Sequence, residues 1–451
     1  MKKHSYIAFF LTLFCCQALW ATHNRAGEIS FEALGQFTYR ATIHTYTKAS
    51  SRPADRDSLE ICWGDGTCEW VLRTNGDGLT LPNDIKYNQY IIQHTYADFG
   101  EYRISMTDPN RTGGNLNLNP PSSDNIPFHI ESRLVVGVET NNSPQLLMPP
   151  IDRGFVGLPF SHTPNAFDID DDSLAYELTV PLQASNVEVP NYSFPNQVRP
   201  GPMNNISIDP ITGEFQWVSP AEPGEYTVAI LIKEYRNGIL IGSVLRDLMI
   251  TVELSESPPP GFQGPNPPSV FQAGDILEVD FEARGFDTLR SRFSATGGAF
   301  ILDDSPATFS TTGSFQQGTI TANLRWAITD AHERQQPYQF AVKAEDQAGG
   351  FSLFVFQISI DNSNSVPELS TLGQVQIYPN PAKDQLWLDW NRIPLQNALL
   401  IRIYDLQGQL VLEQSTTATS AQLDVSQLPS GPYLLTLNSG TFSLSQQWIK
   451  G

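Results

Sequence analysis

Three stretches near one end of the chain decide its fold class: VQIYPNPAKDQLWLDW at residues 375–390, IRIYDLQGQLVLEQ at 401–414 and LDVSQLPSGPYLLTLNSGTFSLSQQWIK at 423–450. In each stretch, apolar and polar side chains alternate, which is the period of a half-buried strand. Turns rich in proline, glycine and asparagine separate the runs. The pattern predicts a small antiparallel sandwich over residues 372–451.

The order of motifs in these stretches is YPNP, then IYDLQGQLV, then LDVSQLPSGPYLLTL and a late lysine. It resembles the type A C-terminal sorting domain of the bacterial type IX secretion system. In that family the domain is an immunoglobulin-like sandwich recognised by an outer-membrane translocon and commonly removed, with the cargo then released or attached to surface polysaccharide. The resemblance implies that the translocon is a partner and that none of the matching residues is catalytic. The recognised surface, or its scaffold, would contain Tyr378, Pro379, Asn380, Pro381, Gly408, Gly431, Tyr433 and Lys450.

The composition extends this prediction to the rest of the chain. At 451 residues it is long enough for three or four domains, each with its own core. Aromatic residues make up 11% against only 17% charged residues, and 32 glycines and 33 prolines interrupt the sequence, which favours many short strands joined by turns. We therefore expect an all-β protein of tandem immunoglobulin-like β-sandwich domains, arranged as beads on a string.

The N-terminal residues have the pattern of a secretory signal peptide, predicted at residues 1–21. Two lysines precede an apolar run at 7–19, and the small residue Ala21 follows. The run is too short to span a membrane and no later stretch approaches that length, so no transmembrane segment is expected. A lipoprotein signal at Cys15 and Cys16 ranks second, because a glycine or alanine should precede the modified cysteine. The expected route is export through the periplasm to the outer surface or medium of a Gram-negative bacterium.

The charge of the mature chain excludes one class of partner. Removing residues 1–21 takes two of the 27 basic residues and none of the 48 acidic ones, which leaves 25 against 48 and a formal charge of −23. Nucleic acids and anionic lipids would be repelled by such a surface. An acidic surface is also the ordinary solution to staying soluble outside a cell, so charge alone points to no ligand.

The first predicted domain covers residues 22–140. FTYRATIHTYTK at 37–48 alternates cleanly between two faces, and LEICWGDGTCEWVL and YIIQHTYADFGEYRISMTD follow it. A tryptophan, a GDG turn and a later H-x-Y…G-x-Y run resemble the polycystic-kidney-disease-like (PKD-like) sandwich. A long loop before the histidine departs from that pattern and should hold an extra strand or a binding surface. The matching positions are Trp63, Asp65, Gly66, His94, Tyr96, Gly100 and Tyr102.

Two cysteines, Cys62 and Cys68, remain after the signal peptide is removed, and an oxidising compartment suggests one disulfide. A two-residue turn would leave Cys62 opposite Glu69. A three-residue loop at 64–66, with Gly66 at positive φ, places Cys62 opposite Cys68 instead, and we favour it. The ring is so small that the bond should stabilise the fold by only about 2 kcal/mol. Two unpaired buried thiols are the alternative.

The second predicted domain covers residues 142–255. It contains DIDDDSLAY from Asp168, DPITGEFQW from Asp209 and PAEPGEY ending at Tyr226. These landmarks resemble the cadherin-like immunoglobulin modules of bacterial surface proteins. The resemblance implies that the Asp-Pro-x-Thr-Gly turn begins a strand whose tryptophan, Trp217, fills the core.

The DIDDD segment of this domain places four carboxylates close together, and a cation would relieve their repulsion. Calcium takes about six to eight oxygen ligands, and carboxylates at alternate positions suit it. An EF-hand loop does not fit, because its sixth and twelfth positions would be Ser173 and Thr179. Together with the cadherin-like resemblance, the pattern predicts a calcium site, and a solvated turn is the alternative. Its ligands would be Asp168, Asp170, Asp171 and Asp172.

A proline-rich linker at 256–269 precedes the third predicted domain at 270–362, and a second linker at 363–371 leads to the sorting domain. PYQFAVKAEDQAGG in the third domain resembles the penultimate strand and turn of surface modules in which an aspartate, here Asp346, precedes the final hairpin.

A tryptophan followed by a tyrosine that a glycine or proline closely precedes recurs in the second and third domains. The pairs are Trp217 with Tyr226 and Trp326 with Tyr338. Because each residue lies on an alternating strand, we predict that they fill cores and do not form stacking platforms for sugars.

No catalytic motif emerges from the sequence. His332 and Glu333 are followed by no second histidine that would complete H-E-x-x-H, and neither a G-x-S-x-G elbow nor a nucleotide-binding loop occurs. Carboxylate pairs of a glycosidase need only suitable separation in space, which a sequence does not show. We therefore expect a non-catalytic adhesion, binding or spacer protein whose ligand is an unidentified surface glycan or protein. A carbohydrate-active accessory protein or degenerate surface hydrolase is the alternative.

Three short triplets of aspartate, serine or threonine and leucine resemble O-glycosylation acceptors of the bacterial phylum that uses type IX export. Triplets this short also arise by chance. The acceptor side chains would be Ser58, Ser173 and Thr288.

Overall fold

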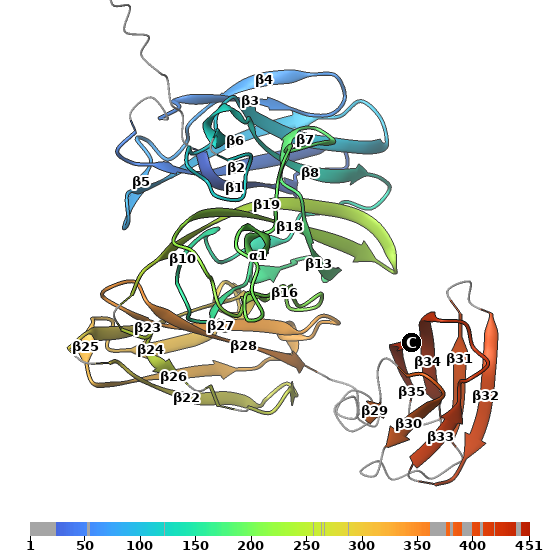
Figure 1. Cartoon of the computed structure of the whole chain (residues 1–451). Helices are drawn as coiled ribbons and strands as arrows, with labels where there is room; N and C mark the ends of the chain where they lie inside the picture. The colour runs from blue at the N-terminus through green and yellow to red at the C-terminus, as the bar shows by residue number, and fades with distance from the viewer. Residues whose placement is uncertain are drawn as a thin grey trace, which may run out of the picture. The chain divides into compact units, whose positions relative to one another are not determined.

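The structure is a computed structural model in which almost all regular elements are β-strands (Figure 1). The predicted signal peptide and the linker at 363–371 lie outside the described residues, and within those residues no helix is long and apolar enough to cross a membrane. Two compact units form, one from residues up to 267 with 274–359, the other from 268–273 with 360–451. The described residues are 24–51, 55–120, 122–255, 257–262, 264–265, 267–286, 288–360, 376–378, 382–389, 399–405, 409–418, 420–438 and 443–451.

The first unit is built around a sheet of 14 strands whose main path runs β4-β3-β7-β8-β19-β1-β2-β6-β5. These strands are β1 (Asn24–Ala33), β2 (Thr38–Lys48), β3 (Ser58–Cys62), β4 (Cys68–Leu72), β5 (Leu79–Leu81), β6 (Ile85–Thr95), β7 (Gly100–Asp108), β8 (Phe128–Val136) and β19 (Ile239–Glu253).

Alternate residues of these strands fill one core. Tyr39 and Ile43 of β2 are fully buried, whereas Arg40 and Thr42 between them are half-exposed, which confirms the alternation predicted for residues 37–48. Apolar residues of β1, β3, β6, β7 and β8 pack in the same core, so the sheet curls over it. The long loop predicted before His94 does hold an extra strand, β5.

The first and second predicted domains are not separate beads, which corrects the arrangement expected from the sequence. Strand β19 of the second domain pairs with β1, where Gly27 faces Asp247, and with β8, where Gly242 faces Leu134. The long strand β18 (Gly224–Arg236) pairs with β19 along its whole length. Strand β19 is mostly buried and forms backbone hydrogen bonds with strands of both predicted domains. It therefore borders the cores of both domains.

The rest of the second domain is made of short strands around β18 and β19. They contain a core of Phe160, Phe215 and Trp217 with inward residues of β18. The elements are β9 (Gln145–Leu146), β10 (Ile151–Phe155), β11 (Phe160–His162), β12 (Ala166–Phe167), β13 (Ser173–Thr179), β14 (Leu182–Ala184), β15 (Val187–Glu188), β16 (Ile206–Ile208), β17 (Phe215–Trp217), the helix α1 (Pro195–Val198) and the 3₁₀ turn η2 (Ser123–Asn125).

The third domain is a sandwich of two sheets. One has the order β20-β22-β26-β24 and the other contains β28-β27-β23-β25, with phenylalanines such as Phe281 and Phe293 packed between them. Its elements are β20 (Gly261–Phe262), β21 (Val270–Phe271), β22 (Ile276–Arg284), β23 (Arg290–Gly297), η3 (Gly298–Phe300), β24 (Thr308–Thr311), β25 (Gln316–Gln317), β26 (Thr319–Ala327), η4 (Asp330–His332), β27 (Tyr338–Asp346) and β28 (Phe351–Ile360).

The second unit contains the small sandwich predicted for residues 372–451. One sheet has the order β29-β30-β33 and the other β32-β31-β34-β35, and Leu386, Ile401 and Trp448 are buried between them. The strands are β29 (Gln376–Tyr378), β30 (Gln385–Asp389), β31 (Leu399–Tyr404), β32 (Leu410–Thr416), β33 (Ser420–Asp424), β34 (Gly431–Asn438) and β35 (Ser443–Lys450).

One tyrosine hydrogen bond recurs in three of these sandwiches. In each G-x-Y segment the tyrosine hydroxyl donates to the backbone carbonyl four residues upstream: Tyr102 to Asp98, Tyr226 to Glu222 and Tyr433 to Pro429. This tyrosine corner is a mark of immunoglobulin-like sandwiches. It fixes the corner where the chain enters a core strand.

Candidate functional site

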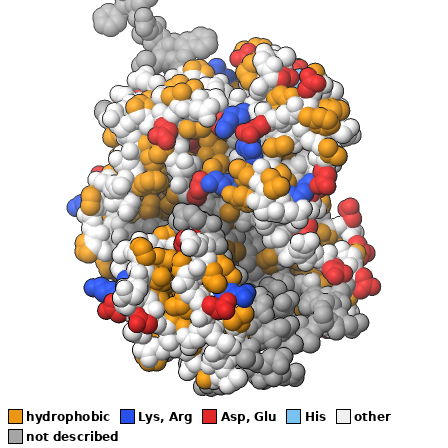
Figure 2. Space-filling view, turned by 90° about the vertical axis from the view of Figure 1, so that its right-hand side faces the viewer, with side chains coloured by type: hydrophobic (Ala, Val, Ile, Leu, Met, Phe, Trp, Pro, Cys, Tyr) orange, Lys and Arg blue, Asp and Glu red, His pale blue; other side chains and the backbone are white. Residues whose placement is uncertain are grey.

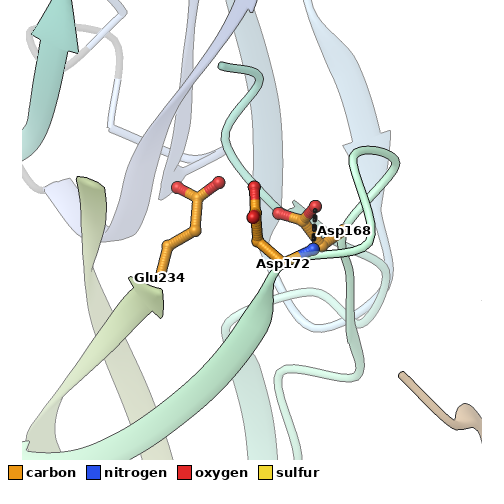
Figure 3. A group of neighbouring side chains, drawn as sticks. All are labelled: Asp168, Asp172 and Glu234. Carbon is orange, nitrogen blue, oxygen red and sulfur yellow. Dashed lines mark hydrogen bonds between the residues drawn. The ribbon is translucent and has the colours of Figure 1, made fainter. Parts of the chain in front are cut away.

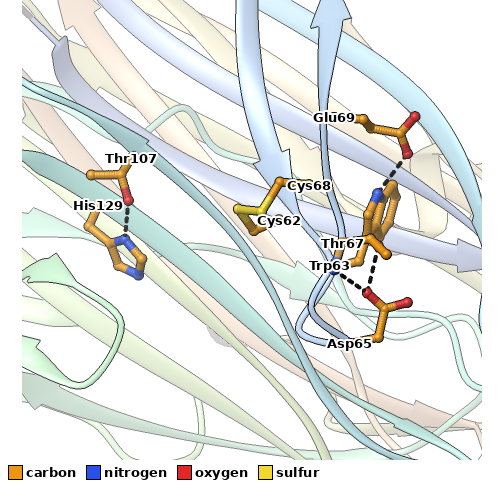
Figure 4. The surroundings of a disulfide bond; sticks show 8 residues. All are labelled: Cys62, Trp63, Asp65, Thr67, Cys68, Glu69, Thr107 and His129. Atoms are coloured by element: carbon orange, nitrogen blue, oxygen red, sulfur yellow. Dashed lines mark hydrogen bonds between the residues drawn. A yellow bond between two sulfur atoms is a disulfide. The ribbon is translucent and has the colours of Figure 1, made fainter.

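The GDG hairpin of the first domain forms as predicted (Figure 4). Cys62 faces Cys68 across β3 and β4, and the two are joined by a disulfide. Gly64 and Gly66 both take positive φ, at 81° and 92°, and the Trp63 amide donates to the Thr67 carbonyl at 3.0 Å. The loop therefore has three residues, and the predicted pairing of the cysteines is confirmed.

The PKD-like landmarks meet around the side chain of Trp63. Its indole is fully buried, donates to Glu69 Oε1 at 2.8 Å and stacks on the ring of His94. Asp65 contacts His94 Nε2 at 2.7 Å and accepts bonds from Thr67. Partial burial acts to raise the pKa of Asp65, but these hydrogen bonds outweigh it and lower the pKa. The landmarks make a packed support for the hairpin.

The acidic turn of the second domain joins three parts of the first unit. Asp170 accepts bonds from the backbone and side-chain amides of Asn142, just after the first domain. Asp171 accepts from the backbone amides of Gln335 and Gln336 in the third domain, at 2.6 and 2.8 Å. Two of the four predicted calcium ligands are thus already bound by protein donors.

The other two predicted ligands, Asp168 and Asp172, meet a third carboxylate, that of Glu234 on β18 (Figure 3). One ligand oxygen from each of the three residues lies within 4.8 Å of the others. Asp168 Oδ1 accepts from the backbone amides of Asp170 and Asp172, at 2.9 and 3.1 Å. Asp172 forms a two-bond ion pair with Arg236, at 2.8 and 2.6 Å.

Glu234 belongs to this group of carboxylates but was not among the predicted ligands. Its side chain is 0% exposed, and among the described residues neither of its carboxylate oxygens has a hydrogen-bond partner. Asp168 Oδ2 also lacks one. Burial, with the nearby charge of Asp168, raises the pKa of Glu234, and burial raises that of Asp168. The sequence does contain a sign of this buried carboxylate. Glu234 follows Ile230 and Ile232 at every second position of β18, so it faces the same interior.

A second buried polar group links the second and third domains. His162 Nδ1 lies 2.6 Å from Asp152 Oδ2, and Lys343 Nζ lies 3.0 Å from Asp152 Oδ1. Burial lowers the pKa of His162, although Asp152 opposes it. Burial acts to raise the pKa of Asp152, but Lys343 and His162 outweigh it and lower the pKa. This group is an ion-paired contact between domains.

A groove of about 630 Å³ lies on the outer face of β1, β2 and β6. Its floor carries Ser30, Thr42, His44, Tyr87 and Gln89. The His44 and Tyr87 side chains are joined by a hydrogen bond of 2.8 Å, and burial lowers the pKa of the histidine.

The two carboxylates that line this groove are neutralised by arginines. Glu28 forms a buried two-bond pair with Arg246, and Glu32 pairs with Arg40. Elsewhere, on the face drawn in Figure 2, acidic and basic side chains are interspersed with apolar ones and do not gather by sign.

The residues of the predicted sorting signal are distributed over the second unit. Gly431 begins β34 and pairs with Lys450 of β35, which is largely buried. Tyr433 is buried and stacks on Trp448. Tyr378 ends β29. Pro379, Asn380, Pro381 and Gly408 lie outside the described residues.

The predicted acceptor side chains for glycosylation have different surroundings. Ser58 on β3 is half-buried, and Ser173 Oγ on β13 donates to the Tyr235 carbonyl at 3.2 Å. Thr288, between β22 and β23, is exposed. Glycosylation of all three stays a prediction, and Thr288 is the most accessible.

Comparison with solved structures finds chains at low similarity. They include a chimeric titin Z1Z2 functionalized with a KLER exogenous peptide from decorin, with 14% identity, 49% of this chain and 97% of that chain covered, and a TM-score of 0.18. The N-terminal Ig1-2 module of the Drosophila receptor protein tyrosine phosphatase DLAR has 16% identity, coverages of 48% and 95%, and a TM-score of 0.20. Dimeric latent PorU from Porphyromonas gingivalis has 12% identity, coverages of 74% and 36%, and a TM-score of 0.19.

Comparison of sequences identifies the second unit. Residues 376–451 match the family model described as a secretion system C-terminal sorting domain, while no curated protein matches the chain significantly. The match covers the sandwich of β29 to β35 and the motifs that predicted it. The chain is therefore a cargo protein of the type IX secretion system, sorted by residues 376–451 to the cell surface or the medium.

Proposed function

We propose that the exported chain is a non-catalytic adhesion or binding protein of the cell surface. The observation that carries this proposal is the burial of its landmark tryptophans: Trp63 and Trp217 are 0% exposed and Trp326 is 1% exposed. A ring that is fully buried cannot stack against a sugar, so these three tryptophans are not stacking platforms of a carbohydrate-active site. These rings face the interiors of their sandwiches, where each packs against a tyrosine.

The groove on β1, β2 and β6 is the surface that we assign to ligand contact. It offers amide and hydroxyl groups from Gln89, Thr42 and Ser30 beside the Tyr87 ring. Its carboxylates are held in ion pairs with Arg246 and Arg40. Carboxylates held in this way suit binding better than general acid–base catalysis, which needs a group free to exchange a proton.

The test is binding of the mature protein to an array of bacterial and host glycans and to intact neighbouring cells, with and without a chelator. We expect binding without release of reducing ends. Gln89→Ala, on the floor of the groove, should weaken binding. Gln93→Ala, four residues further along β6 and outside the groove, should leave it unchanged. Hydrolysis of any arrayed glycan would contradict the proposal.

A further inference from the structure

The carboxylates of Asp168, Asp172 and Glu234 lie close together, and the surrounding protein donors do not satisfy all of their oxygens. Three oxygens in this group, Asp168 Oδ2 and both oxygens of Glu234, have no hydrogen-bond partner among the described residues. The nearest cation of the turn, Arg236, is committed to Asp172. A buried carboxylate without a donor is costly, so the group must bind either a proton or a metal ion.

The backbone holds these oxygens in a fixed arrangement. Amides of the turn hold Asp168 Oδ1, which leaves Oδ2 as the free oxygen of that carboxylate. On the neighbouring strand β19, a Cβ atom at Gly242 would collide with Glu234 Oε2, so the glycine leaves room for the carboxylate in this position. Figure 3 shows the Glu234 carboxylate directed toward those of Asp172 and Asp168.

From this geometry we propose that Asp168, Asp172 and Glu234 hold a hard divalent cation of the calcium class. All the available ligand atoms are carboxylate oxygens, the type that calcium and magnesium prefer over nitrogen or sulfur ligands. Asp170 and Asp171 are not ligands of this site, because their carboxylates lie outside the group of oxygens that approach one another within 4.8 Å and are directed to amides of Asn142, Gln335 and Gln336.

The position of the site gives the cation a structural role. The turn that carries Asp168 is tied to residue 142 through Asp170 and to the third domain through Asp171. Glu234 lies near the end of β18, which pairs with β19 of the shared sheet. A cation between the turn and β18 would fasten the three predicted domains of the first unit to one another. The cation would have this role at the contacts between the domains whether or not the chain is an adhesin.

The experiment uses the full secreted chain after treatment with EDTA, and Ca²⁺ alone as the probe, with Mg²⁺ in a parallel arm. Isothermal titration should show one site, and Ca²⁺ should raise the melting temperature. Glu234→Gln should weaken binding at least about tenfold, because affinity follows the charge of the ligand set. The matched control is Glu177→Gln, which removes a charge from the exposed face of β13 and should bind as the wild type does.

Three results would overturn the proposal: no binding of either ion by the wild type at millimolar concentration, unchanged affinity in Glu234→Gln, or an equal loss in Glu177→Gln. If the wild type binds neither ion and Glu234→Gln melts at a higher temperature than the wild type in EDTA, the carboxylates share a proton and hold no metal ion. Near-ultraviolet circular dichroism checks that Glu234→Gln is folded. Asp168→Asn provides a second variant if it is not, with the same expected loss of binding.

Discussion

The hydroxyl of Tyr226 donates a hydrogen bond of 2.7 Å to the backbone carbonyl of Glu222. Tyr102 and Asp98 form the same bond at a more exposed position, at 3.0 Å. The free energy of a hydrogen bond depends on what replaces it when it is lost. Water can satisfy an exposed carbonyl but reaches a partly buried one less readily.

We therefore expect Tyr226→Phe to lower the free energy of unfolding by about 1–2 kcal/mol, and Tyr102→Phe to lower it by clearly less. Urea denaturation followed by fluorescence measures both values. Equal effects would show that burial of the carbonyl does not set the strength of this corner.

The disulfide between Cys62 and Cys68 closes a ring over a sequence separation of six residues. A ring this short removes little entropy from the unfolded chain, so the double variant Cys62→Ser/Cys68→Ser should lose only about 2 kcal/mol of stability. Denaturation of the wild type with and without reductant gives the same quantity independently. A loss above about 4 kcal/mol would mean that the bond also holds the hairpin against the Trp63 core.

The ion pair of Arg246 and Glu28 crosses the joint between the first two predicted domains and is almost completely buried. Removing one partner leaves an uncompensated charge, so Arg246→Met should cost about 3–5 kcal/mol. Replacing both, as Glu28→Leu/Arg246→Met, should recover much of that loss. Calorimetry should show one transition for both domains in the wild type, because they share a sheet, and two separate transitions would contradict this.

The stability of the joint between the second and third domains should fall as the pH is lowered. The folded protein holds the pKa of buried His162 below its unfolded value of about 6.5, so below that pH the unfolded chain binds the extra proton. The contribution of His162 is thus complete above about pH 6.5 and decreases on acidification. That of Asp152, whose pKa is also lowered, is lost at more acidic pH.

Urea midpoints of the wild type and of His162→Gln between pH 8 and 5 test this dependence. The wild type should lose stability across the range more steeply than the variant does. Since half-buried His44 also has a pKa lowered by desolvation, His44→Gln/His162→Gln should have the flatter profile. Parallel profiles for the wild type and the double variant would refute the prediction.

Local patterns in the sequence predicted much of the fold. Alternation placed Tyr39 and Ile43 in a core, the GDG spacing placed Cys62 opposite Cys68, and the landmark pattern placed Trp217 in its core. These features depend on a few neighbouring residues, whose period or turn chemistry fixes the outcome.

The shared sheet could not be predicted in the same way. Strand β19 pairs with β1 across more than 200 residues, and a strand's own alternation does not say which distant strand lies beside it. The prediction of the calcium ligands was incomplete for a related reason. DIDDD is visible as a cluster, but Asp170 and Asp171 bind amides of Asn142 and Gln335, and Glu234 replaces them from another strand.

The central claim is that residues 376–451 direct the chain out of the cell, and deletion of residues 372–451 tests it most directly. The measurement is the amount of protein in the medium and on the surface, against that in the periplasm, for the full-length and shortened chains in a bacterium with a working type IX system. We expect the shortened chain to accumulate in the periplasm and to be nearly absent outside. Undiminished export of the shortened chain would contradict the account.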